Sequence, residues 1–391
     1  MHHLKIGLLT HSVNPRGGVV HTLELAHALH DAGHDVTVMA PAEAGRGFFR
    51  PVRCRVQLVP VAGAPRDMVE MVGMRIAAYV EHLQSVRARQ CFDVMHAHDG
   101  IGGNALADLQ AQGQRFHFVR TVHHLDSFSQ PRLMAWQHRS VHAAQQVLCV
   151  SRLWQGVLAA EHGIAAHEVP NGVDARRYSA APQPGDAALA ARLGIRSGPG
   201  AAVVMCVGGV ERRKNTLGLL QAFAQLRAHL PGAQLVVAGG ASLLDHTGYA
   251  QAFSAFAQSQ GLQADLVLTG PLADTDMPSL FRLADVVAMP SLSEGFGLVV
   301  LEALCSGKPV VVSRIAPFTE YLEPSDAFWA DPQDEASIVA ALKAALHAAP
   351  TPAASARIAA SAARLSARFS WAKSAARHAQ LYRQALAPVE V

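Results

Sequence analysis

The sequence lacks any long apolar run. No window of its 391 residues reaches the roughly 18 uninterrupted apolar side chains that a membrane-spanning helix needs. Its first residues also lack the apolar core and small-residue cleavage site of a secretory signal peptide, and they have the pattern of a first strand instead. We therefore expect a cytoplasmic protein.

Cysteine and net charge are also scarce. The five cysteines are an odd number with no Cys-x-x-Cys pair, which argues against disulfides and zinc knuckles. Each lies in or beside an apolar stretch, so we expect small buried hydrophobes. The net charge is only +3 and no dense basic run is present, so nothing favours a nucleic-acid partner.

Histidine, by contrast, is abundant, with 21 residues. The pairs His96 with His98 and His123 with His124 raise the question of a metal site. No third ligand at a recognisable helical spacing accompanies either pair. We therefore expect no metal.

Short β-branched apolar runs alternate with longer amphipathic stretches along the whole chain. This alternation predicts βαβ units, and hence an α/β fold of doubly wound parallel sheets covered by helices. The apolar runs are continuous, as expected for strands buried on both faces. Expected strands are 4–10, 35–39, 56–60, 94–96, 117–121, 146–150, 202–207, 234–238, 266–269, 286–289 and 309–312, and expected helices include 21–32, 68–89, 217–229, 277–284, 298–306 and 370–386.

A domain boundary is expected near Asp174. A stretch rich in Ala, Pro and Gly spans 179–200 and a fresh strand follows it. We expect Rossmann-like domains at 1–173 and 174–369, facing a central cleft at the strand ends. The last segment, 370–391, either caps its own domain or crosses back to the first.

The most informative motif spans 290–310. A strand ends, a loop containing Glu294, Gly295, Phe296 and Gly297 turns, and a helix begins. The helix start aims backbone N–H groups and a positive dipole end at a ligand, which suits a diphosphate. Glu302 lies four residues beyond Leu298, one turn deeper on the same helix face, where a carboxylate can bind ribose hydroxyls. The alternative is a helix-face acid at Glu302 and a cap at Glu294.

A second motif follows the first strand of the second half. Gly208-Gly209 leads into Arg212, Arg213 and Lys214 at a strand-to-helix turn. Arg213 and Lys214 could neutralise a departing diphosphate, so that no divalent metal would be required for that charge. The alternative, a solvated basic helix start, is disfavoured because cations sit poorly at a helix N-terminus.

The first half offers weaker signals. Gly17-Gly18 forms a glycine-rich turn before a helix and does not match the Gly-x-Gly-x-x-Gly pattern of dinucleotide sites. His98 and His123 each stand at the carboxyl end of an expected strand. His123 could hydrogen-bond a sugar hydroxyl, and for either histidine structural packing is an equal alternative.

Taken together, these residues resemble the retaining glycosyltransferases of the GT-B fold, glycosyltransferase family 4. The resemblance covers nearly the whole chain and is most specific from Glu294 to Glu302. It implies a nucleotide-sugar donor (UDP- or GDP-linked), a saccharide, small-molecule or lipid-linked acceptor, retention at the anomeric carbon, and no essential metal or other cofactor.

The resemblance also implies roles for individual residues. Lys214, Arg213, Glu294 and His123 would be catalytic, and Glu302 would bind the donor ribose. The remaining donor-binding positions would be Gly17, Gly18, Gly209, Arg212, Leu272, Gly295, Phe296, Gly297, Leu298 and Val299. Many relatives carry arginine where this chain has Gly209, so Arg212 or Arg213 would supply that charge.

Two rival functions stay open: a nucleotide-sugar epimerase on the same scaffold, and a catalytically silent nucleotide-sugar-binding relative. The helix expected at 68–89 mixes apolar and basic residues. It could rest on an anionic membrane and give peripheral contact at its inner face. Packing of its apolar side on the domain core is the favoured alternative.

Overall fold

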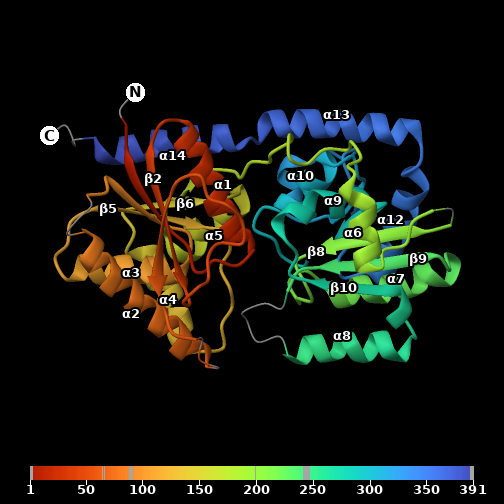
Figure 1. Cartoon of the computed structure of the whole chain (residues 1–391), viewed down its shortest axis with the longest axis horizontal. Coiled ribbons are helices and arrows are strands. Elements are labelled where there is room, and N and C mark those ends of the chain that lie inside the picture. The colour runs from red at the N-terminus through yellow and green to blue at the C-terminus, as the bar shows by residue number, and fades with distance from the viewer. Residues whose placement is uncertain are drawn as a thin grey trace. The chain divides into compact units, whose positions relative to one another are not determined.

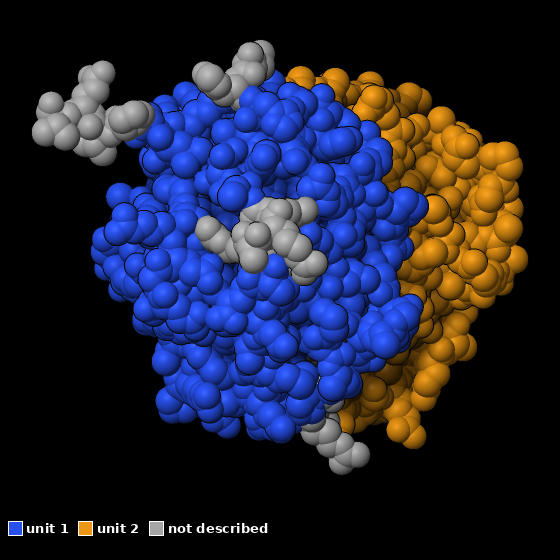
Figure 2. Space-filling model, turned by 60° about the vertical axis from the view of Figure 1, so that its left-hand side comes forward, with its two compact units in different colours: residues 1–172, 369–391 blue, residues 173–368 orange. Residues whose placement is uncertain are grey.

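The structure is a computed structural model that describes residues 3–63, 65, 67–87, 91–198, 200–240 and 247–387. The chain forms two compact units, coloured separately in Figure 2. Unit 1 comprises Met1–Gly172 with Phe369–Val391, and unit 2 comprises Val173–Arg368. Residues 88 and 89 of the predicted 68–89 helix, and 388–391 of the last segment, lie outside the described residues.

Unit 1 is built on a seven-stranded parallel sheet of order β3-β2-β1-β4-β5-β6-β7 (Figure 1). The central strands β1 and β4 are buried apart from Lys5, as expected for largely apolar strands covered on both faces. The strands are β1 (Lys5–Leu9), β2 (Asp35–Ala42), β3 (Arg55–Pro60), β4 (Val94–Ala97), β5 (His117–Val122), β6 (Gln146–Cys149) and β7 (His167–Glu168).

Helices cover both faces of this sheet (Figure 1). One layer consists of α2 (Met68–Arg87), α3 (Gly100–Ala111) and α4 (Pro131–His142), which pack side by side. The other contains α1 (Gly17–Asp31), which packs against the last helix of the chain, α14 (Trp371–Leu386). Helix α5 (Arg152–His162) links β6 to β7.

Unit 2 repeats the plan with a six-stranded parallel sheet of order β10-β9-β8-β11-β12-β13. Its core gathers apolar side chains from three helices over the sheet. The strands are β8 (Ala202–Val207), β9 (Ala233–Ala238), β10 (Leu266–Gly270), β11 (Val286–Met289), β12 (Val310–Ser313) and β13 (Phe328–Ala330).

The helices of unit 2 also form two groups. Helix α7 (Thr216–His229) packs against α8 (Thr247–Ser259) and α12 (Glu335–Ala348). The second group pairs α6 (Gly185–Leu193) with α9 (Met277–Leu283), and α10 (Leu298–Cys305) with α13 (Pro352–Arg368). A one-turn helix, α11 (Phe318–Tyr321), precedes β13. The predicted α/β class with two doubly wound parallel sheets is confirmed.

Several local predictions are corrected. The first helix begins at Gly17, so Gly17 and Gly18 form its first turn and not a separate turn before it. The short edge strands β7 and β13 carried too little pattern to be predicted. Of the cysteines, Cys91 is exposed and Cys54 and Cys305 are half-buried, so only Cys149 and Cys206 are the buried hydrophobes expected of all five.

The apolar side of α2 faces the core of unit 1. Met71, Ile76 and Leu83 are buried there, and the Tyr79 hydroxyl hydrogen-bonds the carbonyls of Thr10 and Met39 at 2.7 and 2.8 Å. This is the packing alternative, and it leaves the helix without the free apolar face that the membrane hypothesis required. Within the described ranges, no helix has the length and hydropathy to cross a bilayer.

Candidate active site

Each sheet has one place where the strand order reverses. In unit 2 the chain runs outward from β8 through β9 and β10 on one side, and from β11 through β12 and β13 on the other. In unit 1 the same reversal falls between β1 and β4. In open α/β sheets ligands bind outside the carboxyl ends of the strands at such a point. The segments leaving β8 and β11 contain the two motifs singled out from the sequence.

The structure brings three predicted catalytic residues of unit 2 into direct contact. One carboxylate oxygen of Glu294 accepts a hydrogen bond from Lys214 Nζ at 2.5 Å, and the other accepts one from Arg213 Nη1 at 3.2 Å. Arg213 Nε also donates to Glu211 at 3.0 Å. The backbone N–H of Leu292 also donates to the Arg213 carbonyl. The loop after β8 and the loop after β11 are therefore joined by a backbone hydrogen bond as well as by ion pairs. Glu294 does not cap α10.

The environment of Glu294 keeps its carboxylate ionised. The residue is only 7% exposed, and burial alone would raise its pKa. The charges of Lys214 and Arg213, with hydrogen bonds from Lys214 and the Gly295 N–H, outweigh burial and lower the pKa of Glu294 to about 2. An ionised Glu294 therefore fixes both cations at the end of β8.

Glycine makes room for Lys214. A Cβ on Gly208 would lie 3.1 Å from the Cε of Lys214, so the lysine side chain passes over this residue. Gly209 has φ +74° and its N–H donates to the Ala238 carbonyl at 2.9 Å. Its contribution is consequently the missing side chain and the turn it permits. Asn215, in the left-handed region at φ 56°, ends the turn as the N-cap residue that precedes α7.

The start of α10 has the geometry expected for anion binding. Gly297 precedes the helix with φ +90°, and a Cβ there would collide with the Phe318 ring. Leu298 and Val299 open the first turn, where backbone N–H groups have no partner within the helix. Phe296 is buried and stacks on Tyr321, with ring centroids 5.2 Å apart, so its side chain belongs to the core.

Glu302 lies on α10 beside a residue that sequence reasoning missed. The Tyr178 hydroxyl hydrogen-bonds the Glu302 carboxylate, and burial together with the charge of Glu302 holds the pKa of Tyr178 well above its usual value. Tyr178 is therefore a neutral donor that orients Glu302. It lies in the segment that follows the Asn171-Gly172-Val173-Asp174 sequence, far from the motif in the chain, so no local pattern signalled the contact.

The remaining unit 2 candidates differ in accessibility. Arg212 is exposed, whereas Arg213 is half-buried against Glu294. Arg213 is thus the arginine that joins Lys214, although what it binds stays a prediction. Leu272 follows β10, whose last residue Gly270 accepts a hydrogen bond from the Gly239 N–H at the end of β9.

In unit 1 the candidate residues gather around a cluster of imidazoles. Ring centroids of His21 lie 4.6 Å from His123 and 5.1 Å from His98. A Cβ on Gly18 would lie 3.6 Å from the His123 ring, so glycine allows α1 to approach this histidine closely. At Gly17, by contrast, the position of an added Cβ is open space.

Helical spacing gives neither histidine pair a third partner, but the structure brings one histidine of each pair together with His21. Ligand atoms of His21, His98 and His123 lie within 4.8 Å of one another. His21 lies on α1, and His98 and His123 follow β4 and β5. A search of the sequence for helical spacing cannot find residues that come together at the carboxyl ends of different strands. Burial, and secondarily the neighbouring cationic groups, lowers the pKa of all three, to about 3 for His21. The rings are thus neutral near pH 7.

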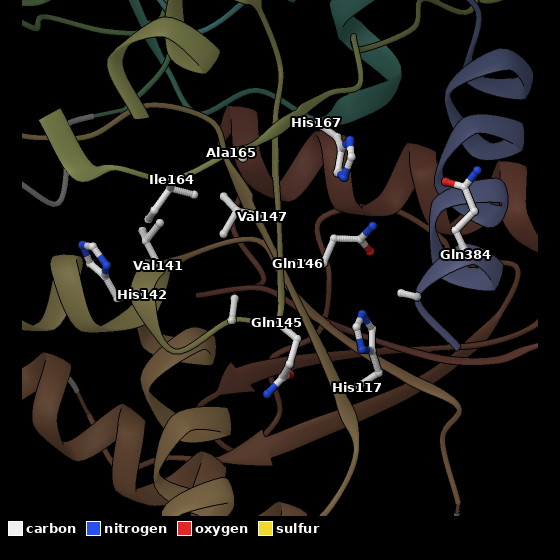
Figure 3. Close-up of a pocket in the computed structure, with 12 residues that line it drawn as sticks. His117, Val141, His142, Gln145, Gln146, Val147, Ile164, Ala165, His167 and Gln384 are labelled. Carbon is white, nitrogen blue, oxygen red and sulfur yellow. The ribbon is translucent and has the colours of Figure 1, made fainter. Parts of the chain in front are cut away.

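A separate hollow of about 550 Å³ lies in unit 1 between β5, α4, β6 and α14 (Figure 3). Its lining includes His117, His142, His167 and several glutamine side chains. None of the predicted site residues lines it. The chemistry inferred from the two switch points therefore does not belong to this hollow.

Two family models match the chain, one in each half. The model described as Glycosyltransferase Family 4 matches residues 15–177, and the one described as Glycosyl transferases group 1 matches residues 194–362. The first match contains β4 and the imidazole cluster, and the second contains β8, β11 and the site residues of unit 2 other than Tyr178.

Curated relatives are similar over most of their length. The chain is 28% identical to the phosphatidyl-myo-inositol mannosyltransferase of Mycolicibacterium smegmatis, covering 86% of this chain and 83% of that protein. It is 29% identical to the D-inositol 3-phosphate glycosyltransferase of Pseudarthrobacter chlorophenolicus, covering 76% and 74%.

Solved structures support the fold. The sucrose-phosphate synthase of Thermosynechococcus elongatus superposes with a TM-score of 0.77 at 22% identity, covering 97% of this chain and 98% of that one. Anabaena HepE in complex with UDP and glucose gives 0.76 at 21%, covering 97% and 100%. The chain belongs to the group 1, family 4 type of glycosyltransferases and has their GT-B fold.

Proposed function

We propose that this protein is a retaining, metal-independent hexosyltransferase that uses a UDP- or GDP-linked sugar and a hydroxyl acceptor. The observation that carries the proposal is the Lys214–Glu294–Arg213 cluster at the switch point of unit 2. It stands with the α10 N-terminus and Glu302 at the sheet edge where α/β folds bind nucleotides. HepE, with its bound UDP-glucose, supports a uridine donor.

The proposed reaction breaks the bond between the anomeric carbon and the diphosphate oxygen. The acceptor oxygen attacks from the same face, and its proton passes to the departing phosphate, so configuration is retained. The protein supplies position and charge stabilisation and no covalent nucleophile. Lys214 and Arg213 bind the diphosphate as its negative charge grows. Glu302 holds the ribose, oriented by Tyr178.

The same arrangement supports the proposed metal independence. Two cationic side chains and the backbone N–H groups at the first turn of α10 provide the positive potential that a divalent ion would otherwise supply. His123, His98 and His21 are neutral in unit 1 and serve as hydrogen-bonding groups for sugar hydroxyls. Relatives named for inositol acceptors make a polyol or its lipid conjugate the first acceptor class to screen.

The test is a calorimetric and thermal-shift screen of the purified protein against UDP, GDP, ADP and their hexose conjugates, with and without EDTA. A ligand at 100 times its dissociation constant should stabilise the protein by about 2.7 kcal/mol. We expect one nucleotide series to bind selectively and the affinity to be unchanged by EDTA. Absence of any nucleotide binding by cooperatively folded protein would exclude the proposal.

Variants assign the residues. Lys214→Ala should lower turnover by about 100-fold or more, as the loss of a charge-stabilising donor does elsewhere. Glu302→Ala should weaken donor binding first. Lys343→Ala, at an exposed lysine on α12, is the matched control and should behave as wild type. Conversion of the donor sugar without any acceptor would instead identify an epimerase.

A further inference from the structure

A second group of three histidines lies on the surface of unit 1, away from the residues discussed so far. His138 and His142 are one turn apart on α4, and His162 is the last residue of α5. Their potential ligand atoms lie within 4.8 Å of one another. Ring centroids are separated by 4.9 Å for His138 and His162, 5.9 Å for His142 and His162, and 6.4 Å for His138 and His142.

The chemistry of this group fits a transition-metal ion. Two histidines at i and i+4 project from the same helix face, the spacing with which helical histidines bind zinc. His162 adds an imidazole from a neighbouring helix. Its Nδ1 is buried and has no hydrogen-bond partner among the residues that the structure describes. A ring nitrogen in that position is costly unless it finds a partner.

The surroundings of His162 disfavour its protonation. Burial lowers the pKa of His162, and the neighbouring His138 and His142 lower it further because like charges oppose its protonation. The exposed positions of His138 and His142 leave room for the small side-chain rotations that ligation requires.

We propose that His138, His142 and His162 bind one late first-row divalent cation, such as Zn²⁺. Zinc–nitrogen bonds of about 2.0–2.1 Å would draw the three ligand atoms together, and water would fill the fourth position of a tetrahedral site. The bound ion would clip the C-terminal end of α4 to that of α5. The inference goes beyond the proposed glycosyl transfer and does not rest on it.

Other histidines near this surface are excluded as ligands by position. His142 also lines the hollow of unit 1, and Figure 3 shows it on the opposite side of that hollow from His117 and His167. The buried group His21, His98 and His123 is a different cluster, and a test must distinguish the two. Substitution of His162 does so, because His162 is absent from the buried group.

The experiment uses the full-length, untagged protein, freed of metal with EDTA and then dialysed. Zn²⁺ is titrated by calorimetry and Co²⁺ by visible absorption, which reports tetrahedral ligation directly. We expect one equivalent of tight binding and a higher melting temperature with Zn²⁺. His162→Gln and His142→Gln should each weaken the binding about 100-fold or more, since a direct ligand is lost, and should abolish the thermal shift.

The control is His347→Gln, at an exposed histidine on α12, which should bind Zn²⁺ like the wild type. Circular dichroism of each variant verifies that the substitution leaves the fold intact. Undiminished Zn²⁺ affinity in folded His162→Gln would place the ion elsewhere and overturn the proposal. The wild type should bind Zn²⁺ at a concentration of about 100 µM, which is on the order of the dissociation constant of a weak site. Failure to bind at that concentration would overturn the proposal as well.

Discussion

At the scale of single residues, the electrostatics of the donor-site candidates centre on Glu294. A buried carboxylate costs free energy unless it is paired, and here it has two cations and a backbone N–H as partners. The pairing has a second consequence. Lys214 and Arg213 are held in place before any ligand arrives, so their positive charge is pre-organised for an anionic group.

The lowered pKa of Glu294 predicts a specific acid sensitivity. Because the folded pKa of about 2 lies below the ordinary value of 4.5, the ion pair stabilises unit 2 above pH 4.5 and loses its effect as pH falls toward 2. Between pH 7 and pH 3 this group should account for a loss of about 2 kcal/mol in the free energy of unfolding. Hydrogen exchange in β8 and β11, corrected for intrinsic rates, measures the loss.

Glu294→Gln provides the comparison. The variant is less stable than wild type at pH 7, because Lys214 keeps its charge and loses its partner. It should lack the acid-dependent component, so that the difference between the two proteins narrows as pH falls to 3. Parallel acid dependence of wild type and variant would show that folding does not lower the pKa of Glu294.

At the scale of elements, the approach to α10 depends on a glycine. Gly297 has a positive φ, and the space where a Cβ would stand is occupied by Phe318. Both constraints act on the same residue that sets the direction of the helix N-terminus. The packing of the Phe296 ring on Tyr321 also holds the loop that precedes α10 in place.

Gly297→Ala should therefore destabilise unit 2 by about 1–3 kcal/mol through strained backbone and displaced packing. It should also weaken nucleotide binding by shifting the first turn of α10. Urea unfolding and calorimetry measure the two effects. The matched control, Gly248→Ala on α8, has open space at its Cβ and should be neutral or stabilising by about 0.5–1 kcal/mol. An equally mild effect at Gly297 would contradict the packing argument.

The sequence predicted the helices and strands better than the tertiary contacts between them. Buried strands such as β8 and β11 have unbroken apolar runs, and a loop containing a glycine follows each of them, Gly208 after β8 and Gly297 after β11. Both motifs could therefore be recognised in the sequence. The three-residue strand β13 could not, since it has almost no pattern of its own. Contacts between distant segments were also invisible: Tyr178 with Glu302, and His21 with His98 and His123. These depend on sheet order, which local periodicity does not encode.

At the scale of the whole molecule, unit 1 is discontinuous in sequence. Its last helix, α14, buries Trp371, Leu381 and Tyr382 and packs against α1. The Tyr382 hydroxyl hydrogen-bonds His96 at 2.6 Å, directly beneath the imidazole cluster. Gly172 lies so close to the start of α14 that a Cβ would collide with the Trp371 backbone. Along the sequence, the helix that completes unit 1 therefore comes after all of unit 2.

This arrangement predicts unequal effects of truncation. Burying three large side chains contributes about 5 kcal/mol or more, comparable with the total stability of a domain. A chain ending at Arg368 should therefore lose protection throughout Met1–Gly172, whereas unit 2 keeps its sheet and its core intact. Limited proteolysis and hydrogen exchange, read separately for peptides of each unit, measure the difference.

A chain ending at Ala387 is the control and should be indistinguishable from wild type, because α14 is retained. If the proposed donor site lies within unit 2, the chain ending at Arg368 should still bind its nucleotide while losing all transfer to an acceptor. Full protection of unit 1 peptides in that chain would mean that α14 is dispensable for its fold. Loss of protection in unit 2 as well would mean that the two units do not fold independently, because removal of α14 takes nothing from the core of unit 2.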